Sequence, residues 1–240
     1  MQALIEGEPE LRRRFVDWNL FHVEPRYSAV RATFRRTAAQ RQAWLKSGGA
    51  GPAVWDDAYA DVLARICDSR EAFFRRLQQA FMVVASGFDL ISGLVLEWRR
   101  GLPDAPDIVP WLSEHRRGDV ARGYSFLSPA RSDFHLSRGG ERWVGSRGQN
   151  KLAGVLLQLA AGQVVASELG DRGVWLVDDL AAELDSATQR QLMPLLINSA
   201  DHALLTSLQG APPGTFEQAS TAVFHVEHGK VRQQQAKPSA

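Results

Sequence analysis

The chain has 240 residues, of which 45% are hydrophobic and 23% are charged, and its formal net charge is +1. A chain of this length buries a substantial core in one or two domains, and its near-neutral charge excludes a polycation that binds nucleic acid by bulk charge. Arginine supplies most of the positive charge; it suits phosphate recognition, although a GC-rich genome gives the same bias.

Residues 1–120 are predicted to be mainly helical. A partial amphipathic helix is expected at 11–18, a helix at 25–46, and a break at the Gly- and Pro-containing stretch 47–52. The clearest helix is 53–86, because its apolar residues recur at helical intervals. They are Trp55, Tyr59, Val62, Ile66, Phe73, Leu77 and Phe81. This stripe predicts a core-packing face, with a coiled-coil partner surface as the alternative. A strand or short helix, a loop and another short helix complete the part up to residue 120.

The pattern changes from Tyr124 onward. The predicted elements are a hairpin over 134–144, a helix over 151–169, a strand at 174–177, a helix over 187–198 that contains Pro194, a strand at 203–206 and a closing hairpin over 222–231. A strand, a helix and a second strand in this order predict an α/β layer.

Ser146, Arg147, Gly148 and Gln149 stand at the start of the predicted helix 151–169. Ser146 and Gln149 have the spacing of a capping box, and Gly148 removes a side chain where a ligand would approach. Free N–H groups and the helix dipole make such a start a binding place for anions. An ordinary capped helix is the alternative.

Asp178 and Asp179 follow the apolar strand Val-Trp-Leu-Val at 174–177. Asp178 is a candidate ligand for Mg²⁺, and Asp179 is a candidate catalytic acid that polarises an attacking water. A strand followed by a polar turn is the alternative. Next come Glu183, Leu184 and Asp185, where Asp185 or Ser186 caps a new helix, and then Thr206 at the end of the next strand.

These four features occur in the order of the signature, Walker B, D-loop and switch strand of an ABC-type ATPase head. Longer stretches resemble the RecF family of bacterial DNA replication and repair proteins. Residues 4–25 resemble its G-x-P-x-x-R-R-x-F-L-D-W-G-x-F-H-V-E-P block, and 121–133 its A-R-G-x-T-x-x-G-P-H-R-A-D block. Residues 146–151 and 178–185 resemble S-R-G-Q-Q-K and D-D-x-A-S-E-L-D.

Several residues depart from the family pattern. Gly145 replaces the Leu before the signature, Asn150 its second Gln, and Ala182 the Ser of the D-loop. Ser128, Ala130 and Ser132 change the 128–133 block. Neither acid of the Walker B motif is affected, so these changes concern the trans nucleotide contact and the signalling between subunits.

The resemblance implies a mixed α/β fold, namely the C-terminal half of an ABC/SMC-type P-loop ATPase head with a mainly helical lobe. The expected domains are a head segment at 1–24, a helical lobe at 25–120 and the half-head at 121–240. No Gly-rich Walker A loop ending in Gly-Lys-Ser/Thr occurs, so the chain corresponds to an incomplete family member and no ATPase activity is expected from it alone.

The resemblance also implies ATP and Mg²⁺ as cofactors, an ATP-dependent homodimer, and RecO and RecR as partners in gap repair and the SOS response. Ser146, Arg147, Gly148 and Gln149 would contact nucleotide in trans. The DNA ligands would be single-stranded, gapped or junction DNA, bound through phosphate charge. The candidate DNA contacts are Arg12, Arg13, Arg35, Arg36, Arg116 and Arg117. For each of these, a solvated surface or a salt bridge is the alternative.

Other features point to a cytoplasmic protein with no membrane partner. The N-terminus lacks the apolar region of a signal peptide, and residues 152–166 are too short and polar to span a bilayer. Cys67 is the single cysteine, which excludes an internal disulfide. Another SMC-like ATPase head fragment and a nucleotide-independent binding remnant remain as alternatives; the family-specific blocks disfavour a transporter head.

Overall fold

The computed structural model describes residues 3–51, 53–103, 107–179, 184–208 and 221–234. The chain forms two compact units, which are described separately below. The helical unit contains residues 3–79 and 94–143, and the C-terminal unit contains residues 80–93 together with the chain from Val144 onward.

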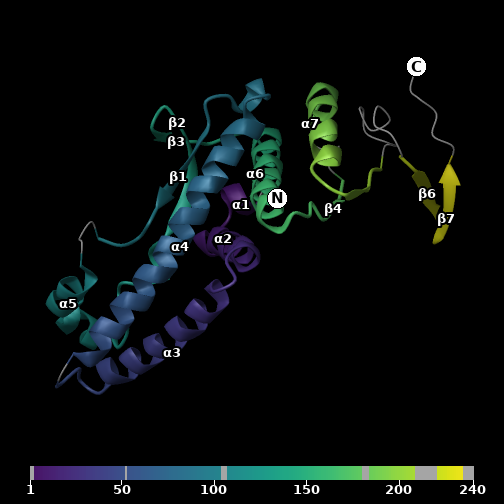
Figure 1. Cartoon of the computed structure of the whole chain (residues 1–240). Helices are drawn as coiled ribbons and strands as arrows, with labels where there is room; N and C mark the ends of the chain where they lie inside the picture. The colour runs from purple at the N-terminus through teal and green to yellow at the C-terminus, as the bar shows by residue number, and fades with distance from the viewer. Residues whose placement is uncertain (1–2, 52, 104–106, 180–183, 209–220, 235–240) are drawn as a thin grey trace. The chain divides into compact units, whose positions relative to one another are not determined.

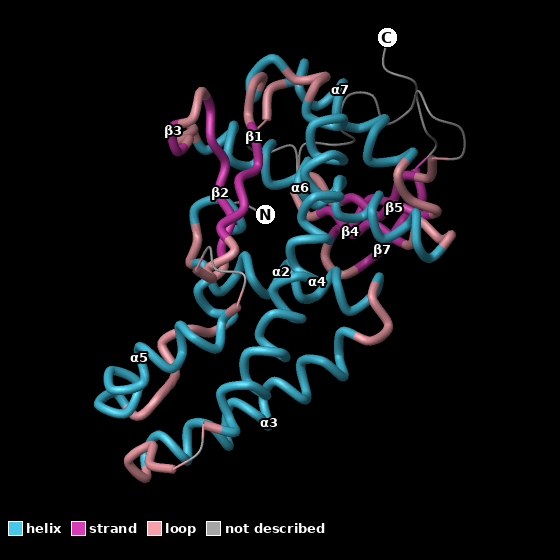
Figure 2. Tube along the Cα trace, turned by 60° about the vertical axis from the view of Figure 1, so that its left-hand side comes forward, coloured by secondary structure: helices cyan, strands magenta, loops and turns pink. Residues whose placement is uncertain are grey.

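Helices and a small antiparallel sheet make up the helical unit. Its elements are α1 (Ala3–Glu6), α2 (Pro9–Val23), α3 (Tyr27–Lys46), most of α4 (Val54–Ala85), β1 (Val95–Arg99), α5 (Ile108–Arg122), the 3-10 turn η2 (Pro129–Arg131), β2 (Asp133–Arg138) and β3 (Glu141–Arg142). The strand order is β1-β2-β3, with Leu96 opposite Leu136 and Trp98 opposite Phe134. Figure 2 shows β1 and β2 side by side.

The apolar stripe of α4 is a core-packing face, as its spacing predicts. Six of the seven stripe residues are buried; they are Tyr59, Val62, Ile66, Phe73, Leu77 and Phe81. Trp55, the second residue of α4, is partly exposed. Toward that end of α4, Tyr59 and Leu63 pack with Leu112 of α5 and with Leu127. The coiled-coil alternative is therefore not needed to explain the stripe.

Three arginines are buried in the helical unit, each beside carboxylates. The Arg70 guanidinium donates to both oxygens of Asp17, at 2.8 and 2.9 Å. Asp17 also accepts from the Tyr27 hydroxyl. Burial raises the pKa of Tyr27 far above its ordinary value. Charges taken out of water in this way require close, hydrogen-bonded partners.

The C-terminal unit carries the strand–helix–strand layer. Its elements are the end of α4, the 3-10 turn η1 (Asp89–Ile91), α6 (Arg147–Leu169), β4 (Val174–Val177), α7 (Ser186–Asn198), β5 (His202–Leu205), β6 (Val223–Glu227) and β7 (Lys230–Gln234). β4 and β5 are parallel, with α7 as the crossover, and β6 and β7 form an antiparallel hairpin. The predicted α/β layer and the closing hairpin are thus both present, and α7 includes Pro194.

Helix α6 is the centre of this unit. Its buried residues include Leu152, Leu156, Leu157 and Leu159. By length and composition the helix would also reach across a membrane, but about half of its apolar window is buried inside the unit. That burial is the pattern of a core helix in a folded domain.

The compact units do not follow the three predicted segments. Residues 121–143 belong with the helical unit because β2 pairs with β1, and the N-terminal segment joins the same unit because α2 packs on β2. Phe15 of α2 contacts Phe134 of β2 at a ring distance of 6.3 Å. Residues 80–93, predicted as part of the helical lobe, belong to the C-terminal unit. These pairings are long-range in sequence, so local patterns did not reveal them.

Candidate functional site

Asp178, Asp179 and Thr206 come together where the parallel strands β4 and β5 end. Thr206 directly follows β5, and its N–H donates to the carbonyl of Val177, the last residue of β4, at 2.9 Å. The Thr206 hydroxyl donates to the Asp178 carboxylate, and the Asp179 N–H donates to the Thr206 hydroxyl at 3.1 Å. The polar groups predicted at the two strand ends therefore form one hydrogen-bonded cluster.

The backbone of Asp179 is strained. Its φ is +43°, in the left-handed region that residues other than glycine seldom adopt. Such strain is characteristic of functional sites, where the surroundings hold it in place. One of those surroundings is Lys151 of α6, whose Nζ donates to the Asp179 carbonyl at 3.0 Å.

Sequence reasoning gave Lys151 no role, although it stands in the 146–151 run. It lies 28 residues from Asp179 in the chain, and neither residue's local pattern predicts the contact. Through this bond the helix that begins at the predicted signature is tied directly to the predicted Walker B turn. Because Lys151 donates to the backbone carbonyl of Asp179, this hydrogen bond does not occupy the Asp179 carboxylate.

The start of α6 has the predicted capping box. The Gln149 N–H donates to the Ser146 hydroxyl at 3.4 Å, and the Gln149 side chain accepts from the Ser146 N–H at 2.9 Å. Gln149 also donates to the Leu90 carbonyl of η1. Ser146 and Arg147 are exposed, and Gly148 is partly exposed. The helix start is thus fixed in shape and open to an anionic ligand.

Of the two cap candidates, Asp185 and Ser186, it is Asp185 that caps α7. Its carboxylate accepts from the N–H groups of Ala187 and Thr188, each at 2.9 Å, and from the Thr188 hydroxyl. The hydrogen bonds from Thr188 hold the pKa of Asp185 below its ordinary value. Leu184 is buried, and Glu183 lies outside the described residues.

The oxygen atoms at this strand end suit Mg²⁺ better than a transition metal. Asp178 is exposed and offers a carboxylate beside the Thr206 hydroxyl. Among the residues that the structure describes, no three His, Cys, Asp or Glu side chains form a metal cage. Mg²⁺ typically uses one or two carboxylates and completes its shell with water and phosphate oxygens. The residues present therefore fit a Mg²⁺–nucleotide complex.

The candidate DNA-contacting arginines lie in unequal surroundings, and Arg12 must be corrected. Arg12 is 2% exposed, and its Nε and Nη2 donate to the two oxygens of Asp133 at 2.8 and 2.9 Å. A phosphate would have to displace this buried ion pair, so Arg12 is a structural residue. Beside it, Arg13 is half-buried, and burial lowers its pKa.

The remaining candidates are more accessible. Arg35 and Arg36 of α3 and Arg117 of α5 are exposed. Arg116 is partly buried and donates to Asp56 at 2.9 Å. Its guanidinium also lies over the ring of Trp44, at 5.2 Å from the centroid. Arg35, Arg36 and Arg117 therefore stay candidates for phosphate contact, whereas Arg116 is already largely engaged.

No family model matches the chain. Among curated proteins it is 33% identical over 243 residues to "DNA replication and repair protein RecF" of Pseudomonas fluorescens Pf0-1. It is 32% identical over 237 residues to the protein of the same name from Pseudomonas syringae pv. syringae B728a. Each match covers 96% of this chain and 65% of the relative, so the chain spans just under two thirds of these relatives.

Two solved structures of the recombination mediator protein RecF in the RecFOR pathway share the fold. The one described with ATP has a TM-score of 0.77 and covers 97% of this chain and 66% of that one. The one described with ATPrS has a TM-score of 0.74 and covers 98% and 66%. Sequence identity is 20% in both cases, so these matches establish the fold alone, which is the mixed α/β fold expected from the sequence.

Proposed function

Because this chain is homologous to RecF over 96% of its length, which confirms the resemblance seen in its sequence, we propose that it supplies the signature and Walker B half of a RecF-type DNA-repair ATPase. The observation that carries the proposal is the cluster of Asp178, Thr206 and Asp179, tied by Lys151 to the capped start of α6. Three of the four motifs, namely the signature, Walker B and the switch strand, are thus connected by direct hydrogen bonds.

In the proposed site each residue has a separate task. Asp178 orients Mg²⁺, which neutralises phosphate charge when it is bound with ATP. Thr206 holds the Asp178 carboxylate in place, and Asp179 polarises the attacking water. The N–H groups at the start of α6, with Ser146 and Gln149, contact the nucleotide held by the other subunit.

The Walker A loop of one subunit would thus face the signature helix of its partner in an ATP-dependent homodimer. A chain that contributes only the signature and Walker B hydrolyses no ATP alone, because no loop N–H groups and lysine cradle the β- and γ-phosphates. The proposed biological role is to bind gapped, junction or single-stranded DNA in the cytoplasm. It would act with RecO and RecR in gap repair and the SOS response.

An experiment on the native protein tests this proposal. Its intact mass and N-terminal peptide are determined after purification from the source organism, and its sedimentation is measured with and without ATP and Mg²⁺. We expect the native protein to be longer than these 240 residues, with a Gly-Lys-Ser/Thr loop in its additional N-terminal segment. We also expect it to form an ATP-dependent dimer. Ser146→Arg should prevent dimerisation, while Asp178→Asn should slow hydrolysis by at least ~100-fold, since positioning and electrostatics supply most of phosphoryl-transfer catalysis.

The exposed Arg65→Gln is the control that should change neither property. A native protein that begins at Met1 and shows no response to nucleotide would contradict the ATPase proposal. The chain would then be a nucleotide-independent module that binds DNA or partner proteins, which is the second candidate function.

A further inference from the structure

The helices α3, α4 and α5 meet at one end of the helical unit (Figure 1). A network of buried charges joins them there. Arg41 is completely buried; it donates to Asp56 at 2.8 Å and to Asp119 at 3.0 Å. Arg116 donates to Asp56 and Arg122 to Asp119. Two carboxylates thus pair with three guanidinium groups, so the network has one more positive charge than negative charges.

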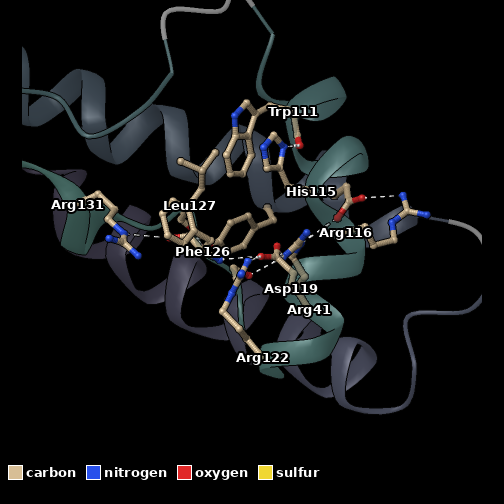
Figure 3. A network of polar contacts seen from close by, with 12 residues as sticks. Arg41, Trp111, His115, Arg116, Asp119, Arg122, Phe126, Leu127 and Arg131 are labelled. Atoms are coloured by element: carbon tan, nitrogen blue, oxygen red, sulfur yellow. Dashed lines mark hydrogen bonds and ion pairs between the residues drawn. The ribbon is translucent and has the colours of Figure 1, made fainter.

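A row of planar groups lies beside this network, as Figure 3 shows. The rings of His115 and Trp111 are stacked with centroids 3.7 Å apart and planes 7° apart. Trp111 is also stacked with Phe126, at 6.2 Å and 24°. The Arg131 guanidinium carbon lies 3.9 Å from the Phe126 centroid. Two aromatic rings are thus flanked by an imidazole and a guanidinium in a single stack.

The two end groups of this stack are open to solvent. His115 and Arg131 are both exposed, and Phe126 is 39% exposed. Nearby in the chain, Tyr124 is 49% exposed. Unstacked nucleic-acid bases bind aromatic rings and guanidinium planes because every base has an aromatic face. The stack therefore offers two places where a base extends it.

The surrounding charge favours a polyanion. The exposed Arg122 of α5 lies over the Phe126 ring, with its guanidinium carbon 5.3 Å from the centroid, and Lys46 of α3 is also exposed. Lys46 lies beside Gly123, since a Cβ built on Gly123 would be 3.4 Å from the Lys46 Cγ. Glu114 is an exposed acid on the same helix, but Arg131, Arg122 and Lys46 outnumber it. Aromatic planes among cations are the features with which proteins bind single-stranded nucleic acid.

We propose that the stack of His115, Trp111, Phe126 and Arg131 is a binding platform for single-stranded nucleic acid. Bases extend the stack at His115 and Arg131, and the exposed cations contact the phosphates. The inference rests on the proposed DNA binding and places the single strand on the helical unit. Of the arginines considered from the sequence, only Arg116 belongs to the neighbouring network, while Arg117, two residues from His115, faces another side of α5. The stacking residues were not among those candidates.

Fluorescence anisotropy of the full chain with a labelled 20-mer of thymidine tests this proposal. A matched 20-mer of abasic sites has the same phosphates and no bases. We expect the wild-type chain to bind the thymidine strand about 10-fold more tightly, as the stacking of one base implies. The double variant His115→Ala/Arg131→Gln should lose this preference, because both changed residues are exposed ends of the stack.

Two further variants separate stacking from charge and from folding. Arg65→Gln removes one exposed positive charge elsewhere on the helical unit and should keep the base preference. Phe126→Leu keeps an apolar side chain in the middle of the stack and should also reduce the preference. Circular dichroism checks that each variant is folded.

The outcomes distinguish this inference from the proposed function. Equal affinity of the wild-type chain for both strands, or a double variant that keeps the preference, would overturn the stacking platform while leaving DNA binding intact. No binding of the wild-type chain to single-stranded, gapped or duplex DNA would overturn both.

Discussion

In the helical unit Arg41 and Arg70 are buried with carboxylates that pair with them, whereas in the C-terminal unit Leu176 and Leu204 are exposed opposite each other on β4 and β5. Leu176 is 74% exposed and Leu204 60%. The first unit buries even charged side chains, while the second leaves one apolar face of its parallel strands exposed.

The helical unit itself supplies the carboxylates that its buried arginines require, whereas the C-terminal unit leaves the apolar face of β4 and β5 exposed to solvent. Parallel strands are usually covered on both faces, and unpaired strand edges favour association with other chains. Val174 of β4 is also 58% exposed on this face. The relatives are longer than this chain, and we propose that the rest of a RecF-type head covers the exposed face.

Removing the buried Arg41 should have the largest effect. Arg41→Met removes the fully buried hydrogen bonds to Asp56 and Asp119, which then keep only the more exposed Arg116 and Arg122 as partners; we expect a loss of about 4 kcal/mol in the free energy of unfolding. Urea unfolding followed by circular dichroism measures it. The control is Arg65→Met, whose pair with Asp61 is exposed and should contribute less than about 1 kcal/mol. A loss as small as that control's would show that the network contributes little.

Within the C-terminal unit, the interior of α6 and the exposed face of β4 should respond differently to the same change. Leu156→Ala creates a cavity at a residue with 0% exposure and should cost about 3 kcal/mol. Leu176→Ala should change stability by less than about 0.5 kcal/mol, because its side chain is already in water. Equal losses in urea unfolding would mean that the β4 face is covered in the isolated chain.

The ion pair of Asp133 with Arg12 predicts a dependence of stability on pH. Burial alone would raise the pKa of Asp133, but the hydrogen bonds and charge of Arg12 outweigh it and hold the pKa below its ordinary value. The pair therefore stabilises the fold above about pH 4 and is lost as the pH falls through the folded-state pKa.

Asp133→Asn should cost about 2 kcal/mol at pH 7, and the difference from wild type should shrink below pH 4. Urea midpoints across this range measure the effect. Asp61→Asn, at an exposed pair, is the control with little effect at any pH. A difference that stays constant with pH would contradict the role of the charged carboxylate.

The smallest expected effect concerns the single thiol, Cys67, which should not react in the folded chain. Cys67 is completely buried in the helical unit, and burial raises its pKa to about 11. At pH 8 about one thiol in a thousand is then ionised, so a disulfide reagent should not label the folded chain. In Cys67→Ser/Val174→Cys the new thiol lies on the exposed β4 face and should react at once. Fast labelling of native Cys67 would show that the helical unit opens readily.

Local pattern predicted the individual elements well. The spacing of apolar residues identified α4, and the Gly139-Gly140 turn identified the β2–β3 hairpin, because these features depend on neighbours a few residues apart. The capping box at Ser146 and the cap at Asp185 were predicted for the same reason. The order of motifs indicated an ABC-type ATPase head, and the longer blocks at 4–25, 121–133, 146–151 and 178–185 carried the resemblance to RecF.

Tertiary structure decided what those elements join. The pairing of β1 with β2 places residues 121–143 in the helical unit. The ion pair with Asp133 makes Arg12 a buried structural residue, although the sequence suggested it as a DNA contact. Lys151 reached Asp179, and Arg131 reached Phe126, only after folding. A sequence alone determines periodicity, caps and motif order, since these are local. Which charge is buried and which ring is stacked depends on side chains brought together from distant parts of the chain.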